Sequence, residues 1–145
     1  MKKHLLGKTG LEIVPLGFGG MELRYCNAMQ AKELLNKVLD LGVNYVDTSP
    51  EYPTSEYYIG DYISKRRMEF YLATKCGDDL YTDSPAYTYR WDRETCTKNL
   101  ENSLRLMKTD YIAVWQLHAV VPETIKNGKY DDVILCMQEA QRQGK

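Results

Sequence analysis

Leu16-Gly17-Phe18-Gly19-Gly20-Met21-Glu22 is the stretch that separates the two folds the sequence allows. It reads as a buried strand over 16–19 that ends at Gly20 and leads toward an amphipathic helix. A doubly wound dinucleotide-binding sheet carries the pattern G-x-G-x-x-G at this junction, where the third glycine allows close packing of helix on strand. Glu22 stands where that glycine belongs, so the pattern argues against a doubly wound sheet.

The rest of the chain alternates short apolar runs with amphipathic segments. Further strands are predicted at 43–46, 70–74 and 111–117, and helices at about 31–41, from Ser55, at 92–107 and at 131–143. The inward faces predicted for three of these helices are Ala31, Leu34, Leu35, Val38 and Leu39; Cys96, Leu100, Leu104 and Met107; and Val133, Ile134, Met137 and Ala140. Parallel strands need crossover connections, so this alternation indicates a parallel sheet covered by helices.

The length of each strand–helix unit selects the architecture. Residues 16–145 hold four units of about 33 residues each, and eight such units would reach the roughly 250 residues of a barrel. The sequence therefore predicts an α/β fold made of the first four βα units of a (β/α)8 TIM barrel. A short hairpin of residues 4–6 and 11–14, around a glycine-containing turn, is expected to precede it.

Charge and hydropathy exclude several classes of protein. The 145 residues include 19 Lys and Arg against 20 Asp and Glu, which gives a net charge of -1, and no dense basic block suited to nucleic acid is present. No apolar run approaches the roughly 20 residues needed to span a bilayer. The N-terminus lacks the apolar core of a secretory signal. We therefore expect a cytoplasmic protein that binds neither nucleic acid nor membrane.

The cysteines and histidines offer little to a metal ion. Cys26, Cys76, Cys96 and Cys136 are 50, 20 and 40 residues apart, without a Cys-x-x-Cys pair, and the chain has only two histidines. This spacing suits neither a zinc site nor a disulfide framework. The cysteines are expected to be free thiols in a reducing compartment, and no metal site is predicted.

Four polar residues are predicted at one rim of the sheet. Asp47, Lys75 and His118 end three successive strands, and Tyr52 lies on the loop after the second strand. In parallel α/β folds the active site lies at the carboxyl ends of the strands. Taken singly, each residue also has a structural explanation, as a helix cap, a surface tyrosine or a structural histidine. Three ionisable residues at the ends of three successive strands favour a catalytic site.

The chemistry of these residues is mutually consistent. A tyrosine hydroxyl ordinarily has a pKa of about 10, so it donates a proton near neutral pH only if a nearby cation stabilises the phenolate. Lys75 can supply that cation, Asp47 can keep the lysine charged, and His118 can hydrogen-bond a substrate oxygen. Such a set can protonate an alkoxide that forms when a hydride reaches a carbonyl carbon.

The sequence resembles the aldo-keto reductase family along essentially its whole length. The residues that carry the resemblance are 6–11, 15–20, 42–52, 72–75, 99–106, 108–111 and 115–118. The resemblance implies NADPH-dependent reduction of a small carbonyl substrate, with Asp47, Tyr52, Lys75 and His118 as the catalytic tetrad and Tyr52 as general acid. It also implies that Gly19, Gly20, Met21 and Asp47 line the nicotinamide ribose of the cofactor.

The sequence departs from the family pattern in two places. Pro53-Thr54 follows Tyr52 where family members commonly carry glycine, and the chain ends at Lys145, where the family continues into its fifth strand. We therefore expect residues 1–145 to be the N-terminal half of a reductase barrel, inactive alone, that self-associates or needs its missing half. The alternative is a non-catalytic half-barrel interaction module that pairs with another half. The stretch 78–89, rich in Asp and Tyr, either rims the pocket or forms a solvated loop.

Overall fold

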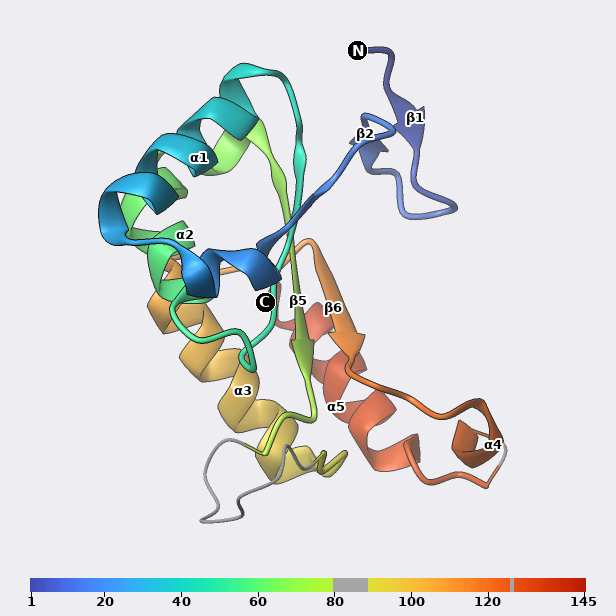
Figure 1. The fold of residues 1–145 in the computed structure, drawn as a ribbon. Helices are drawn as coiled ribbons and strands as arrows, with labels where there is room; N and C mark the ends of the chain where they lie inside the picture. Colours follow the sequence, from blue (N-terminus) through green and yellow to red (C-terminus); the bar gives the residue numbers. More distant parts are fainter. Residues whose placement is uncertain (80–88, 126) are drawn as a thin grey trace.

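A computed structural model describes residues 1–79, 89–125 and 127–145, and its centre is a four-stranded parallel sheet (Figure 1). The strand order follows the sequence: β3 (Phe18–Gly19), β4 (Tyr45–Asp47), β5 (Tyr71–Cys76) and β6 (Val114–Leu117). All neighbouring pairs are parallel, which confirms the predicted sheet. The first strand is shorter than expected: Leu16 lies outside it and is 60% exposed.

The predicted hairpin is present ahead of the sheet. Strands β1 (His4–Leu5) and β2 (Glu12–Ile13) pair antiparallel and stand at one end of the molecule (Figure 1). Asn44 connects this hairpin to the sheet, because its side chain accepts from the Val14 amide at 2.9 Å and donates to the Glu12 carbonyl at 2.8 Å.

The helices follow the strands and pack in chain order, α1 on α2, α2 on α3 and α3 on α5. Their bounds are η1 Gly20–Tyr25, α1 Ala28–Asp40, α2 Ser55–Ile63, η2 Ser64–Glu69, α3 Arg93–Met107, α4 Pro122–Ile125 and α5 Asp131–Arg142. Asn27 and Gln30 form a reciprocal capping box at the start of α1, and Asp92 caps α3 by accepting from the Thr95 amide. In the described part of the chain, no helix is long and apolar enough to cross a membrane.

The main core lies between the sheet and these helices. Val46 and Leu72 on the strands pack with Leu35, Ile59 and Met107 on the helices. The predicted inward face of α3 is confirmed, since all four of its residues are buried. Two residues placed inward by helical spacing are instead exposed, Leu34 at 41% and Ile134 at 42%. Both lie at the margin of the apolar stripe, beyond the side chains that meet the core.

Helices α2 and α3 lie in close backbone contact at Gly60. A β-carbon at this position would collide with the Leu106 carbonyl oxygen and lie 2.9 Å from the Met107 α-carbon. Only glycine allows the two backbones to lie this close. The contact fixes α2, and with it the loop that enters α2 from β4.

Candidate active site

The strands bring three polar side chains to the open face of the sheet. Successive side chains of a strand point to opposite faces. Thr74 of β5 faces the helices and donates to Glu56 of α2, so the neighbouring Lys75 faces the other way. Lys75 pairs in register with Gln116 of β6, and both side chains contact Asp47 at the end of β4.

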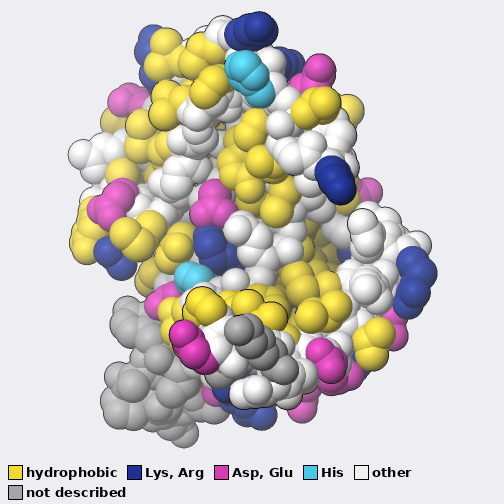
Figure 2. Space-filling model, turned by 90° about the vertical axis from the view of Figure 1, so that its right-hand side faces the viewer, with side chains coloured by type: hydrophobic (Ala, Val, Ile, Leu, Met, Phe, Trp, Pro, Cys, Tyr) yellow, Lys and Arg dark blue, Asp and Glu magenta, His cyan; other side chains and the backbone are white. Residues whose placement is uncertain are grey.

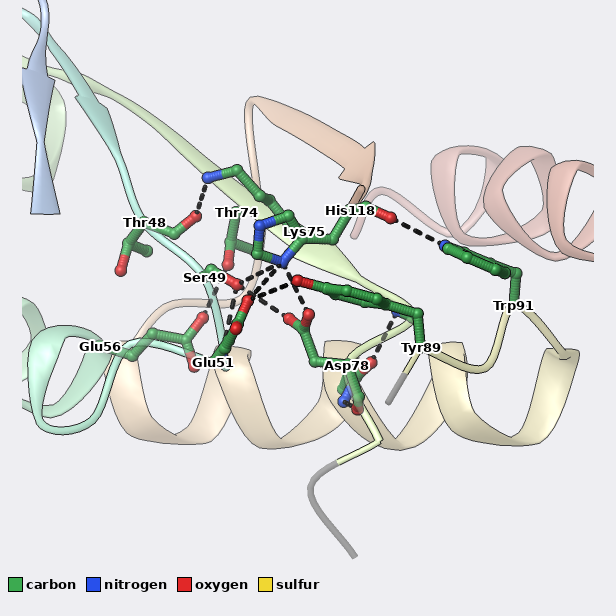
Figure 3. Close-up of polar contacts among 12 residues, drawn as sticks. Thr48, Ser49, Glu51, Glu56, Thr74, Lys75, Asp78, Tyr89, Trp91 and His118 are labelled. Carbon is green, nitrogen blue, oxygen red and sulfur yellow. Dashed lines mark hydrogen bonds and ion pairs between the residues drawn. The ribbon is translucent and has the colours of Figure 1, made fainter. Parts of the chain in front are cut away.

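Lys75 is held by an ion pair and a backbone oxygen. Its ammonium group donates to Asp47 Oδ2 at 2.6 Å. It also donates to the Thr48 carbonyl at 2.7 Å (Figure 3). The other carboxylate oxygen of Asp47 accepts from Gln116 Nε2 at 3.0 Å. The Lys75 side chain is 13% exposed and that of Asp47 is 29% exposed. The Asp47 carboxylate is thus the direct partner of an ammonium group that the protein largely encloses.

Tyr52 lies beside this ion pair on a short closed loop. The Lys75 ammonium lies 5.1 Å from the centre of the Tyr52 ring, and the described residues include no hydrogen bond between Lys75 and the tyrosine hydroxyl. The Lys75 ammonium donates instead to Asp47 and to the Thr48 carbonyl. The loop is closed at its base, where the Thr48 and Ser55 hydroxyls are 2.8 Å apart.

α2 begins at Ser55, where the sequence predicts the start of this helix. The Ser55 hydroxyl is buried against that of Thr48. The N-cap position belongs to Thr54, which adopts a left-handed conformation with φ 68° and makes no side-chain cap. This is the position at which the resemblance led us to expect glycine, and a left-handed backbone favours glycine.

His118 follows β6 and is fixed at both its backbone and its ring. Its amide donates to the Cys76 carbonyl at 2.9 Å, and its carbonyl accepts from Trp91 Nε1 at 2.8 Å. The ring lies edge-on to Tyr52, with centres 6.0 Å apart. Ring atom Nδ1 lies 2.6 Å from Asp78 Oδ1 and 3.3 Å from Glu51 Oε2 (Figure 3).

Tyr89 closes the same cluster from the other side. Its hydroxyl donates to Glu51 Oε2 at 3.0 Å, and its ring lies 5.4 Å from that of His118. Burial, together with the bond to Glu51, raises the pKa of Tyr89 to about 12, so it remains a donor. An isolated antiparallel bridge joins Asp78 to Tyr89, which brings the two ends of the stretch 78–89 to the site. The part of that stretch at 80–88 lies outside the described residues.

Glu56 is a buried carboxyl beneath the site. It is 2% exposed and accepts from the Thr74 hydroxyl at 2.7 Å, while its Oε2 has no partner in the described part of the chain. Burial raises the pKa of Glu56 to about 7, against the opposing effect of the Thr74 hydrogen bond. Near neutral pH this carboxyl is therefore protonated in part of the molecules.

The predicted cofactor residues lie at the end of β3, next to Asp47. Gly19 is exposed, and a β-carbon there would meet no atom within 4 Å. Met21 is also exposed, at 40%. Gly20 is buried, and a β-carbon on it would meet Ser55 Oγ at 2.5 Å. The exposed backbone at Gly19 and the exposed part of Asp47 are compatible with a polar, hydroxyl-bearing group such as a ribose, while Gly20 serves packing.

One group of donor atoms has the composition of a metal site. Glu51, Asp78 and His118 each present a ligand atom, and these atoms lie within 4.8 Å of one another. Ser49 and Tyr89 donate hydrogen bonds to the two carboxylates, and His118 Nδ1 lies at hydrogen-bonding distance from Asp78. A hydrogen-bond network accounts for these contacts.

The sequence pointed to four site residues and missed others that contact them. Gln116 was visible only as the polar end of an apolar strand, and Glu51 only as a neighbour of Tyr52. Asp78 belonged to a stretch for which a solvated loop was an equal alternative, yet it is 2% exposed. Its contact with His118 joins residues 40 positions apart, which no local pattern reveals.

On the face shown in Figure 2, acidic, basic and histidine side chains lie next to one another between exposed hydrophobic side chains. A separate cavity of about 430 Å³ lies between β6 and α5, lined by Trp115, Ile112, Met137 and Ile134 among others. It is apolar on most of its wall and distinct from the cluster around Lys75.

Known proteins resemble this chain in sequence and in fold. The model of the aldo/keto reductase family matches residues 15–145. The uncharacterized oxidoreductase YqkF of Bacillus subtilis is 32% identical over 99% of this chain and 46% of its own length, and L-galactose dehydrogenase of Arabidopsis thaliana is 27% identical over 97% and 44%. The chain spans about half the length of the curated relatives it matches.

A solved structure supports the same assignment. The holo form of aldo-keto reductase AKR11C1 from Bacillus halodurans superposes with a TM-score of 0.89 at 31% identity, covering 99% of this chain and 47% of that protein. The parallel sheet with its N-terminal hairpin therefore corresponds to half of the family's barrel.

Proposed function

The chain belongs to the aldo/keto reductase family, and on that premise we propose that it is the N-terminal half of an oxidoreductase that reduces an aldehyde or ketone to an alcohol with NADPH. The observation that carries the proposal is the Asp47–Lys75 ion pair beside Tyr52. The family relatives support oxidoreductase chemistry, and the choice of NADPH and of a small carbonyl substrate is our inference.

In the proposed reaction Tyr52 is the proton donor. When bound, NADPH supplies a hydride to the carbonyl carbon. The Tyr52 hydroxyl gives its proton to the carbonyl oxygen, and the Lys75 ammonium stabilises the phenolate that remains. Asp47 holds the Lys75 ammonium in place through the 2.6 Å contact. Gln116 donates a hydrogen bond to the other carboxylate oxygen of Asp47 and so fixes the orientation of that carboxylate.

His118 and the end of β3 complete the assignment. His118 faces Tyr52 and would orient the carbonyl oxygen between the two rings. Gly19, Gly20, Met21 and Asp47 would border the ribose next to the nicotinamide, Gly20 by setting the backbone path. No residue in this set requires a metal ion.

The test is an assay of NADPH oxidation with simple aldehydes and ketones, with sequencing of the gene downstream of codon 145 to establish whether the reading frame continues. Reduction by the full-length protein that is lost in Lys75→Met, with NADPH binding retained, supports the proposal. A full-length Lys75→Met variant as active as the parent would contradict it.

A second function, as an interaction module, is favoured by the edge of the sheet. Among the described strands, β3 and β6 each have one paired neighbour, and all four residues of β6 are only half-buried. Unpaired strand edges with apolar side chains favour pairing with another chain. Light scattering of this chain distinguishes self-association from a monomer.

A further inference from the structure

The contact between Asp78 and His118 defines which ring nitrogen carries the proton. Three oxygen atoms surround His118 Nδ1. Asp78 Oδ1 lies 2.6 Å from it, Ser49 Oγ 3.1 Å and Glu51 Oε2 3.3 Å. An ionised carboxylate can only accept a hydrogen bond. Nδ1 is therefore the donor toward this cluster.

The hydroxyl of Ser49 supports the same direction. Ser49 donates its proton to Asp78 Oδ2 at 2.8 Å, so its oxygen offers only lone pairs to other groups. One lone pair accepts from the Glu51 amide at 3.2 Å, and another faces Nδ1. Tyr89 likewise donates its hydroxyl hydrogen bond to Glu51. All three oxygens around Nδ1 thus act as acceptors.

Asp78 is held in place by the surrounding fold. It is 2% exposed, and its backbone is held by Asn99 of α3, which donates to the Asp78 carbonyl at 3.1 Å and accepts from the Gly77 amide at 2.9 Å. A buried carboxylate needs partners of this kind, and here they are Ser49 and His118.

We propose that Asp78 is a positioning residue that fixes His118 with the proton on Nδ1, so that Nε2 donates to a carbonyl oxygen only when the ring is a doubly protonated imidazolium. This inference rests on the proposed function, which gives Nε2 its substrate. None of the described residues hydrogen-bonds to Nε2, and Figure 3 shows this nitrogen turned away from the carboxylates. The neutral ring would present a lone pair there and accept from an alcohol hydroxyl instead.

The experiment is NMR spectroscopy of the protein labelled with ¹⁵N-histidine, at a pH where the ring is neutral. His4 on the exposed strand β1 serves as an internal reference. We expect a protonated Nδ1 and an unprotonated Nε2 for His118, and a shift toward a protonated Nε2 in Asp78→Ala. Asp79→Ala removes the same charge one residue away and should leave the His118 signals unchanged.

Asp78→Asn separates the effect of the His118 tautomer from the effect of the carboxylate charge. It also provides a second test if the alanine variant misfolds. Its amide oxygen can still accept from Nδ1, so the tautomer should be retained, while kcat for carbonyl reduction should fall by roughly tenfold or more because the imidazolium loses its counter-charge. A protonated Nε2 in the parent protein, or an unchanged tautomer in a folded Asp78→Ala variant, would overturn the proposal. A confirmed tautomer in a protein without reductase activity supports the positioning role and counts against the proposed function alone.

Discussion

Lys75 Nζ lies 2.6 Å from Asp47 Oδ2, across the gap between neighbouring strands β5 and β4. Each strand contributes one charge, and the register that pairs Asp47 with Ala73 sets the side chains at the same edge. The Thr48 carbonyl and Gln116 hold the pair from either side. The position of the ammonium group is thus a property of the sheet, and the tyrosine beside it is the residue to test first.

Tyr52→Phe removes only a hydroxyl, so in the full-length protein it should lower kcat by roughly 100-fold or more while leaving NADPH affinity nearly unchanged. The measurement is steady-state reduction of an aldehyde, with a fluorescence titration of NADPH. Tyr57→Phe is the matched control, because Tyr57 is 47% exposed on α2. If Tyr57→Phe were the inactive variant, the assignment of the proton donor would be wrong.

Glu56→Gln should change how stability depends on pH. The folded state holds a proton on Glu56 up to about pH 7, whereas the unfolded chain releases it near the ordinary carboxyl pKa of 4.5. The folded state then binds more protons between these values, so ionisation of Glu56 destabilises the fold as pH rises through this window, by on the order of 3 kcal/mol.

The amide does not ionise, so Glu56→Gln should gain stability relative to the parent between pH 4.5 and 7 and keep that gain above pH 7. Urea denaturation at pH 4.5 and pH 8 measures this difference. Glu94→Gln on the exposed side of α3 is the control and should show no such gain. An equal effect of Glu56→Gln at both pH values would show that burial does not raise the pKa of Glu56.

Gly60→Ala should destabilise the fold by about 3 kcal/mol, although alanine in a helix is ordinarily better than glycine by about 1 kcal/mol. The reason is the collision of a β-carbon with the backbone of α3 at Leu106. Gly19→Ala is the comparison, because a β-carbon there meets nothing within 4 Å. Thermal unfolding of both variants should give a large drop in Tm for the first and a small change for the second.

Thr54→Gly should stabilise the protein by about 1 kcal/mol, because a β-branched residue with φ 68° is strained and glycine is not. Ser64→Gly, at a right-handed position with φ -57°, should instead cost about 0.5–1 kcal/mol. Chemical denaturation compares the two. Loss of stability in Thr54→Gly would mean that the flexibility of glycine in the unfolded chain outweighs the strain.

Much of the fold was predictable because its signals are local. Helical spacing identified the buried face of α3, and the apolar runs located the four strands. Helical spacing could not predict whether Leu34 and Ile134 are buried, since the width of the buried stripe depends on which neighbouring elements pack against the helix. The strand ends brought Asp47 and Lys75 together as expected. Asp78 and Glu56 required the tertiary structure, because burial of a carboxyl depends on the elements that fold over it.

The hydroxyl contact between Thr48 and Ser55 has a consequence for how this protein can diversify. It ties the two ends of the loop to β4 and α2, while Ser49 and Glu51 within the loop bond to Asp78 and Tyr89. Substitutions at Asp78 or Tyr89 that alter which molecule is bound would therefore also disturb the loop that carries Tyr52. Substrate choice and proton delivery are then expected to change together.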